Sequence, residues 1–225
     1  MGKLIVIESG TDGSGKASQT EKLYSYLKEL ELNVIKVSYP NYGKPQCALV
    51  EMYLNGDFGN KAFDVNPYTS SIFYAADRYA SYKLEWEDKF ALEDTIVLAD
   101  RYVTSNIIHQ GAKFKTHSEL DRYVEWIEDL EYNKNNIPSP DMVIYLDLPY
   151  EYSQKLIEKR GLESNHKIDI HEKDKAYLKK SYETSKYLAK KLGWKRIECI
   201  ENGKIRPIDS IAKDINTLVL SYLME

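Results

Sequence analysis

A short apolar segment followed at once by a glycine-rich loop and a helical pattern is the feature that most constrains this fold. Leu4–Ile7 is apolar, and Gly10–Lys16 (GTDGSGK) comes two residues later. Leucines then recur with helical spacing at positions 23, 27 and 30. Glycines in such a loop let several backbone N–H groups point into one concavity, to which the next helix adds its positive end. The arrangement therefore predicts a polyphosphate site at a strand–helix junction.

The loop residues are the candidates for holding nucleotide phosphates. The ammonium of Lys16 can reach the β- and γ-phosphates, while the loop amides surround them. An ordinary glycine-rich turn is the alternative, but the strand before the loop and the helix after it favour a phosphate site. We predict that this site is formed by Gly10, Gly13, Ser14, Gly15, Lys16, Ala17 and Ser18.

One loop position departs from the usual pattern. A phosphate loop normally has Ser or Thr after the lysine, where the hydroxyl is a ligand of Mg²⁺, but this chain has Ala17 and then Ser18. Either Ser18 substitutes for the missing hydroxyl, or Mg²⁺ is held by water, phosphate and a carboxylate elsewhere. Mg²⁺ keeps several waters and needs only one or two protein ligands, so the departure bears on metal geometry rather than on nucleotide binding.

The alternation of strand and helix patterns predicts an α/β fold. Apolar strand-like segments at 4–7, 34–39, 95–99, 142–148 and 196–200 are separated by helical patterns at 67–90, after 102, after 117, at 149–160 and at 172–192, and a last helix contains Ile208–Leu218. This order indicates a mostly parallel five-stranded sheet flanked by helices, a three-layer sandwich. With 225 residues, we expect one domain (1–225). The polar segment at about 160–171 suits a small lid.

Composition excludes several classes of function. The net charge of −4 argues against a general nucleic-acid-binding protein, which needs a basic surface. The apolar runs are only strand-length, so we expect no membrane span. The chain enters the loop within ten residues, and no secretory signal is expected. Cys47 and Cys199 match no metal-binding spacing, and two reduced thiols are typical of a cytoplasmic protein.

A second group of polar residues follows the predicted strand at 95–99. In a parallel sheet, ligands bind beyond the carboxyl ends of the strands, so we expect Asp100 and Arg101 beside the phosphate loop. Asp100 can hold Mg²⁺ or its water shell, and Arg101 can clamp a phosphate with two parallel N–H bonds. The alternative is that Asp100 only caps the next helix and Arg101 points to solvent.

These motifs together resemble the thymidylate kinase family over essentially the whole chain. The resemblance rests on GTDGSGKASQ (Gly10–Gln19), YAADR (Tyr74–Arg78), DRYVTSNIIHQG (Asp100–Gly111), and Lys159-Arg160-Gly161 followed by Asp169 and Glu172. It implies a P-loop NTPase-type fold with a lid. It also implies transfer of the γ-phosphoryl group of ATP to dTMP, giving dTDP and ADP, with Mg²⁺ as cofactor and with a homodimer as the assembly.

The resemblance assigns roles to individual residues. A carboxylate beside phosphate is repelled by roughly 4 kcal/mol at an effective dielectric constant near 20, so Asp12 should face another group, and the resemblance implies the 3′-hydroxyl of dTMP. Arg101 is expected to grip the acceptor phosphate, and Tyr74 to stack on thymine. The implied sets are catalytic Lys16, Arg101, Arg160 and Asp12; dTMP-binding Asp12, Tyr74, Arg78, Arg101, Asn106 and Gln110; and metal-binding Asp100 and Ser18.

Several positions differ from the pattern of the family. Gly13 stands where some members have arginine, so we expect the lid to supply positive charge through Arg160 first and Lys167 second. Ile170 replaces an arginine and His109 an aromatic residue, and the turn at 39–42 lacks an arginine. Together with Ala17, these differences leave two alternatives open: a catalytically weakened nucleotide-binding paralogue, or a kinase for another nucleoside or deoxynucleoside monophosphate.

Overall fold

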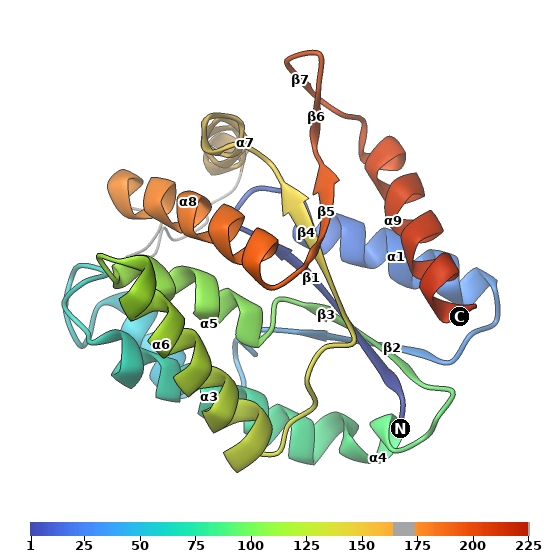
Figure 1. Ribbon diagram of the computed structural model, residues 1–225, viewed down its shortest axis with the longest axis horizontal. Coiled ribbons are helices and arrows are strands. Elements are labelled where there is room, and N and C mark those ends of the chain that lie inside the picture. Colours follow the sequence, from blue (N-terminus) through green and yellow to red (C-terminus); the bar gives the residue numbers. More distant parts are fainter. Residues whose placement is uncertain (164–173, 225) are drawn as a thin grey trace.

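The computed structural model describes residues 1–163 and 174–224. Its central sheet has five parallel strands in the order β2–β3–β1–β4–β5 (Figure 1). The strands are β1 (Lys3–Ser9), β2 (Val34–Ser38), β3 (Ile96–Asp100), β4 (Met142–Asp147) and β5 (Lys195–Glu198). The predicted parallel five-stranded sheet is therefore confirmed. The last strand ends two residues before its predicted end, because residue 200 belongs to a small antiparallel hairpin of β6 (Ile200–Glu201) and β7 (Lys204–Ile205).

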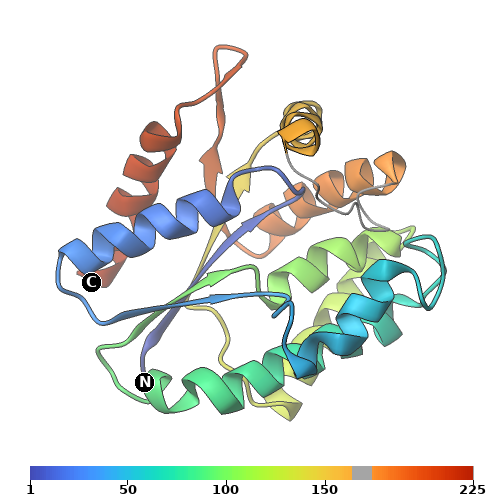
Figure 2. The same cartoon turned by 180° about the vertical axis from the view of Figure 1, so that it is seen from behind.

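Helices cover both faces of this sheet, as Figures 1 and 2 show from opposite sides. Ile5 and Ile7 of β1 pack with residues of α1 (Lys16–Glu29) and α9 (Ile208–Leu223). Leu4 and Val6 point the other way, toward a core that includes residues of α5 (Val103–His109), α6 (His117–Glu128) and α8 (Lys175–Lys191). Alternate residues of one strand thus contribute to two cores, which explains why residues 4–7 of β1 are all apolar.

The predicted helix from Pro67 to Phe90 is helical throughout but changes from α-helix to π-helix and back. It consists of α3 (Pro67–Ser81), a π-helical segment (Tyr82–Trp86) and α4 (Glu87–Phe90). Pro67 occupies the first turn and the Asn66 side chain caps it, accepting a hydrogen bond from the backbone of Tyr68 at 2.8 Å. A second π-helical segment (Asp129–Lys134) follows α6, whose start is fixed by a capping box between Thr116 and Glu119.

The remaining elements are short or lie near the gap in the described residues. The sequence patterns missed α2 (Ala48–Asn55), whose eight residues are too few for a clear period. Helix α7 (Tyr150–Glu163) extends three residues past its predicted end, and one-turn 3₁₀ helices lie at Pro45–Cys47 and Gly111–Lys113. Across the described residues, no helix has both the length and the apolar character needed to cross a bilayer.

Sheet topology places the two predicted groups of polar residues side by side. The phosphate loop follows β1, and Asp100 is the last residue of β3, where it lies opposite Ile7 of β1. Both strands end at the same edge of the sheet, the edge at which ligands bind in parallel α/β folds. The candidate site is therefore built from the carboxyl ends of β1 and β3.

Candidate active site

The phosphate loop folds as its glycine spacing predicts. Gly15 is the N-cap residue of α1 and has φ of 90°, a left-handed conformation that glycine adopts without a steric penalty. Gly13 has φ of 75°, and a β-carbon there would lie 2.9 Å from Cγ1 of Ile157 on α7. Gly10 lies deeper and packs against α8. The loop can thus turn tightly beneath α7 only with glycine at these positions.

The Lys16 side chain is held within the loop and is only 5% exposed. Its ammonium donates to Oγ of Ser9 at 2.7 Å and to the carbonyl oxygen of Thr11 at 3.1 Å. Nζ of Lys16 also lies 3.8 Å from Oδ1 of Asp12. The hydroxyl of Ser14 donates to the same Ser9 oxygen at 2.6 Å. A compact positive charge is therefore fixed at the start of α1, where phosphate oxygens are favoured.

A cavity of about 110 Å³ lies at the mouth of the loop. Six of the seven predicted phosphate-binding residues line it: Gly13, Ser14, Gly15, Lys16, Ala17 and Ser18. The other lining residues are Asp12, Asp100 and Arg101, so the end of β3 does contribute to this cavity, as the topology predicts. Gly10 lies outside the lining.

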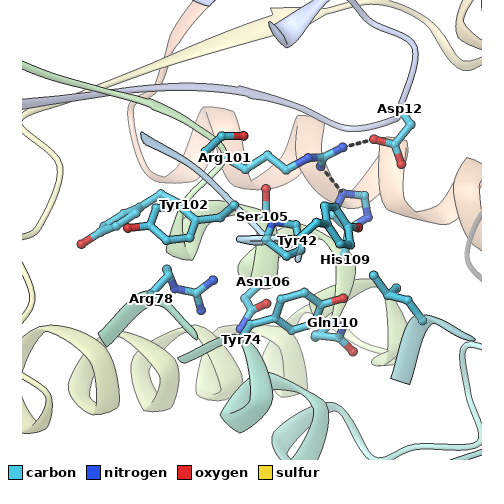
Figure 3. A pocket seen from close by; sticks show the side chains of 14 residues that line it. Asp12, Tyr42, Tyr74, Arg78, Arg101, Tyr102, Ser105, Asn106, His109 and Gln110 are labelled. Carbon is cyan, nitrogen blue, oxygen red and sulfur yellow. Dashed lines mark hydrogen bonds and ion pairs between the residues drawn. The ribbon is translucent and has the colours of Figure 1, made fainter. Parts of the chain in front are cut away.

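A second cavity, of about 280 Å³, shares Asp12 and Arg101 with the first. Figure 3 shows the side chains that line it. All six of the predicted dTMP-binding residues line it: Asp12, Tyr74, Arg78, Arg101, Asn106 and Gln110. They come from the phosphate loop, from α3, and from the stretch that follows β3. Sequence segments almost one hundred residues apart therefore converge on one concave, mixed polar and aromatic site, which is the usual character of a small-molecule site.

Asp12 and Arg101 line both cavities and form an ion pair between them. Nη2 of Arg101 donates to Oδ1 of Asp12, and Nη1 lies 3.4 Å from Nε2 of His109 (Figure 3). Arg101 has φ of 68°, in the left-handed region that residues other than glycine seldom adopt. Its backbone N–H donates to the carbonyl of Ile7 at 3.3 Å. Backbone strain of this kind clusters at functional sites, where the surrounding structure imposes it.

Arg78 lies at the wall of the larger cavity and is paired with a residue that sequence reasoning missed. Its side chain is 2% exposed and that of Glu131, on the second π-helical segment, is completely buried. Nε of Arg78 donates to both carboxylate oxygens at 3.1 Å, and Nη2 donates to Oε1. Burial disfavours the charge of the guanidinium, but Glu131 outweighs this effect and the pKa of Arg78 is raised. Arg78 is thus a permanent, oriented cation.

The aromatic and amide groups of this cavity are also held in place. The ring of Tyr74 packs edge-on against that of Tyr53, with centroids 6.3 Å apart. Nδ2 of Asn106 donates to the carbonyl of Ser71 at 3.4 Å, and Oε1 of Gln110 accepts from the hydroxyl of Ser70 at 2.7 Å. An amide fixed at one end presents its other end at a defined position, which is what recognition of a base edge requires.

The segment after β2 supplies one wall of the larger cavity through Tyr39, Pro40 and Tyr42. It is anchored by Asp77 of α3, whose carboxylate accepts from the backbone N–H of Asn41 at 3.0 Å and from its Nδ2 at 3.1 Å. Burial raises the pKa of Asp77, and the bonds from Asn41 oppose this rise. Sequence reasoning did not single out Asp77, because an acidic residue in a helix resembles a solvated surface charge.

The carboxylate of Asp100 shows whether the small cavity suits a metal ion. Its Oδ1 is buried and has no hydrogen-bond partner among the described residues, which is unusual for a carboxylate. Burial raises the pKa of Asp100, and the nearby Lys16 ammonium lowers it. Ser18 is exposed and lines the same small cavity. In the part of the chain that is described, no group of three or more His, Cys, Asp or Glu residues is arranged so that it could hold a metal ion. The donors present therefore fit Mg²⁺ held by one carboxylate, water and phosphate.

The predicted basic residues of the lid lie outside what is described. Arg160 belongs to α7, but its side chain is not among the described groups. Lys167, Asp169, Ile170 and Glu172, and with them most of the predicted lid at 160–171, fall in the undescribed stretch 164–173. Their roles stay predictions.

Comparison with known proteins indicates the same family as the sequence motifs. The family model "Thymidylate kinase" matches residues 7–203. "Probable thymidylate kinase 1" of Saccharolobus solfataricus is 34% identical over 180 residues, covering 80% of this chain and 79% of that protein. "Thymidylate kinase" of Mycobacterium tuberculosis is 28% identical over 149 residues, covering 66% and 67%. "Thymidylate kinase" of Plasmodium falciparum is 26% identical over 216 residues, covering 93% and 91%.

Proposed function

This chain belongs to the thymidylate kinase family, and we propose that it transfers the γ-phosphoryl group of ATP to dTMP, giving dTDP and ADP. The observation that carries the proposal is the pair of adjoining cavities with Asp12 and Arg101 at their junction. A reaction between two nucleotides requires their phosphates to meet end to end, each held by its own groups. The adjoining cavities supply that arrangement.

On the donor side, the loop amides and Lys16 hold the phosphates of ATP. The Lys16 ammonium exchanges its present oxygen partners, Ser9 and Thr11, for phosphate oxygens. Asp100 and Ser18 are the protein groups that would hold Mg²⁺ or its water shell. The metal, when bound, neutralises charge on the β- and γ-phosphoryl oxygens.

On the acceptor side, the larger cavity receives dTMP. Arg101 binds the acceptor phosphate and turns it toward the loop, while Tyr74 stacks on the base. Arg78, Asn106 and Gln110 present fixed N–H and C=O groups to the edge of the base. Asp12 does not bind the phosphates, because its negative charge repels theirs. It instead accepts a hydrogen bond from the 3′-hydroxyl of the sugar.

Positioning and positive charge account for the chemistry that these residues perform. Phosphoryl transfer passes through a loose transition state with charge spread over the oxygens of the transferred group. Lys16 and Arg101 approach that group from the two cavities, and Arg160 is proposed as a third cation. No strong base is required, because the acceptor phosphate is already ionised at neutral pH.

The assembly and the location of the protein are further parts of this proposal. Two exposed apolar residues on one face of α3 support a homodimer: Ile72 (52% exposed) and Tyr79 (43%) lie two turns apart. Cys47 and Cys199 are buried and unpaired, which suits a reducing cytoplasm.

A monophosphate panel tests the function. We expect the purified protein with Mg²⁺ and ATP to phosphorylate dTMP in preference to dUMP, dGMP and AMP. Lys16→Ala is the inactive control, which should abolish transfer because it removes the ammonium that acts on the phosphates at the start of α1. If no acceptor is turned over above the Lys16→Ala background, the proposal is wrong. If another monophosphate is phosphorylated faster than dTMP, that monophosphate is the preferred acceptor.

A further inference from the structure

The buried carboxylate of Glu8, outside both cavities, connects the phosphate loop to α5, the helix after β3 that contributes residues to the larger cavity and is called the acceptor helix below. Glu8 is the penultimate residue of β1, the central strand, and its side chain is completely buried. A carboxylate is rarely buried unless its oxygens are well supplied with hydrogen-bond donors. The position of those donors indicates what the residue does.

One carboxylate oxygen of Glu8 serves the donor side. Oε1 accepts from the backbone N–H of Ser9 at 2.9 Å. The hydroxyl of Ser9 in turn accepts from Nζ of Lys16 at 2.7 Å and from Ser14 at 2.6 Å, and donates to the carbonyl of Thr11 at 2.8 Å. The Ser9 hydroxyl therefore bonds to three residues of the loop, and Glu8 fixes the backbone of Ser9.

The other carboxylate oxygen serves the acceptor side. Oε2 accepts from the hydroxyls of Thr104 at 2.8 Å and Ser105 at 2.6 Å, both in the first turn of α5. Ser105 lines the larger cavity, and the same helix brings Asn106 and His109 to it. Hydrogen bonds to an ionised oxygen are short and strong, so this contact fixes the start of α5 relative to β1.

We propose that Glu8 is a positioning residue that sets the distance between the phosphate loop and the acceptor helix α5 for phosphoryl transfer. The inference rests on the proposed function, since it assumes that the two cavities hold donor and acceptor. Reacting groups must meet within a few tenths of an ångström, and a small displacement far from the reacting atoms is costly. Because Glu8 lines neither cavity, its loss should affect transfer more than binding.

Glu8→Gln is the direct test. It keeps the shape of the side chain but turns one accepting oxygen into an N–H₂ group, so that one of the two connections is lost. We expect kcat to fall at least tenfold. The dissociation constants of dTMP and of a non-hydrolysable ATP analogue, measured by calorimetry, should stay within threefold of the parent values. A merely structural role would instead lower the melting temperature and weaken both nucleotides without a selective loss of kcat, and this result would overturn the inference.

Thr104→Val supplies a second variant that keeps the carboxylate and one of its α5 partners. Thr104 lies outside both cavities, and its loss should lower kcat by a smaller factor. In the Glu8→Gln background the same change should have little further effect, because the connection is already broken. If Glu8→Gln does not fold, Thr104→Val decides: an unchanged kcat overturns the inference. The parent protein is assayed first, because an inactive parent refutes the proposed function, whereas unaltered variants of an active parent refute only the role of Glu8.

Discussion

The buried pair of Arg78 and Glu131 allows stability and substrate binding to be separated in one experiment. Arg78→Met leaves the Glu131 carboxylate completely buried without its cation, and three hydrogen bonds disappear with the guanidinium. Removing one partner of a buried ion pair costs about 3–5 kcal/mol. With an m-value of about 2 kcal/mol/M, a loss of about 4 kcal/mol lowers the urea midpoint by about 2 M.

The double variant Arg78→Met/Glu131→Leu should behave differently. Replacing both charges by apolar groups leaves no buried charge unpaired, and such replacements are often neutral or stabilising. We therefore expect its urea midpoint to return to within about 0.5 M of the parent value, roughly 1 kcal/mol at this m-value. Its affinity for dTMP should remain low, because a hydrogen bond to a charged group contributes about 1.5–3 kcal/mol, or roughly 10–100-fold in Kd.

Urea unfolding and calorimetry with dTMP measure the two effects. Arg206→Met is the matched control, since Arg206 pairs with the half-exposed Asp214 at 2.7 Å outside both cavities. Arg206 also donates to the carbonyl oxygens of Glu198 and Ser210, so Arg206→Met should lower the urea midpoint as well, but it should leave dTMP affinity unchanged because Arg206 lines neither cavity. Equal instability of the single and double variants would show that pairing is not what Glu131 contributes. A double variant with normal dTMP affinity would show that Arg78 does not contact the acceptor.

Three further changes have defined outcomes. Arg101→Ala should raise KM for dTMP at least tenfold in steady-state assays and leave KM for ATP within threefold; the opposite pattern would place Arg101 on the donor side. Ala17→Ser should lower the Mg²⁺ concentration for half-maximal rate if the missing hydroxyl matters, whereas an unchanged value would mean that Asp100, water and phosphate suffice. Burial lowers the pKa of Lys113 to about 7, against 10.5 in the unfolded chain, so the unfolded state binds more protons between these values and stability rises with pH. Lys113→Met should remove about 2 kcal/mol of that rise between pH 7 and pH 9, as measured by urea unfolding, and an unaltered slope would contradict it.

The sequence predicted the sheet, and the meeting of the phosphate loop with the end of β3, because both depend on local patterns joined by topology. Apolar runs identified five strands, and the rule that ligands bind at the carboxyl ends of parallel strands brought Asp100 and Arg101 to the loop. The convergence of Tyr74, Arg78 and Gln110 on one cavity, in contrast, rested on the resemblance to a family. No spacing rule relates α3 to the helix after β3.

What the sequence did not reveal are the buried charges that support the site. Glu8, Asp77 and Glu131 each have a partner more than 30 residues away, so no local pattern marks them. In an isolated sequence they are ordinary acidic residues, and only the fold shows that they are buried. The one available signal was Glu8, a charged residue directly after the apolar run Leu4–Ile7.

The central claim is that donor and acceptor phosphates meet at Arg101, between the two cavities. A crystal structure with dTMP bound tests it most directly. The account predicts the base beside Tyr74 in the larger cavity, with a phosphate oxygen about 2.9 Å from the Arg101 guanidinium and facing the phosphate loop. Density that placed the dTMP phosphate away from Arg101, or the base outside this cavity, would contradict the account.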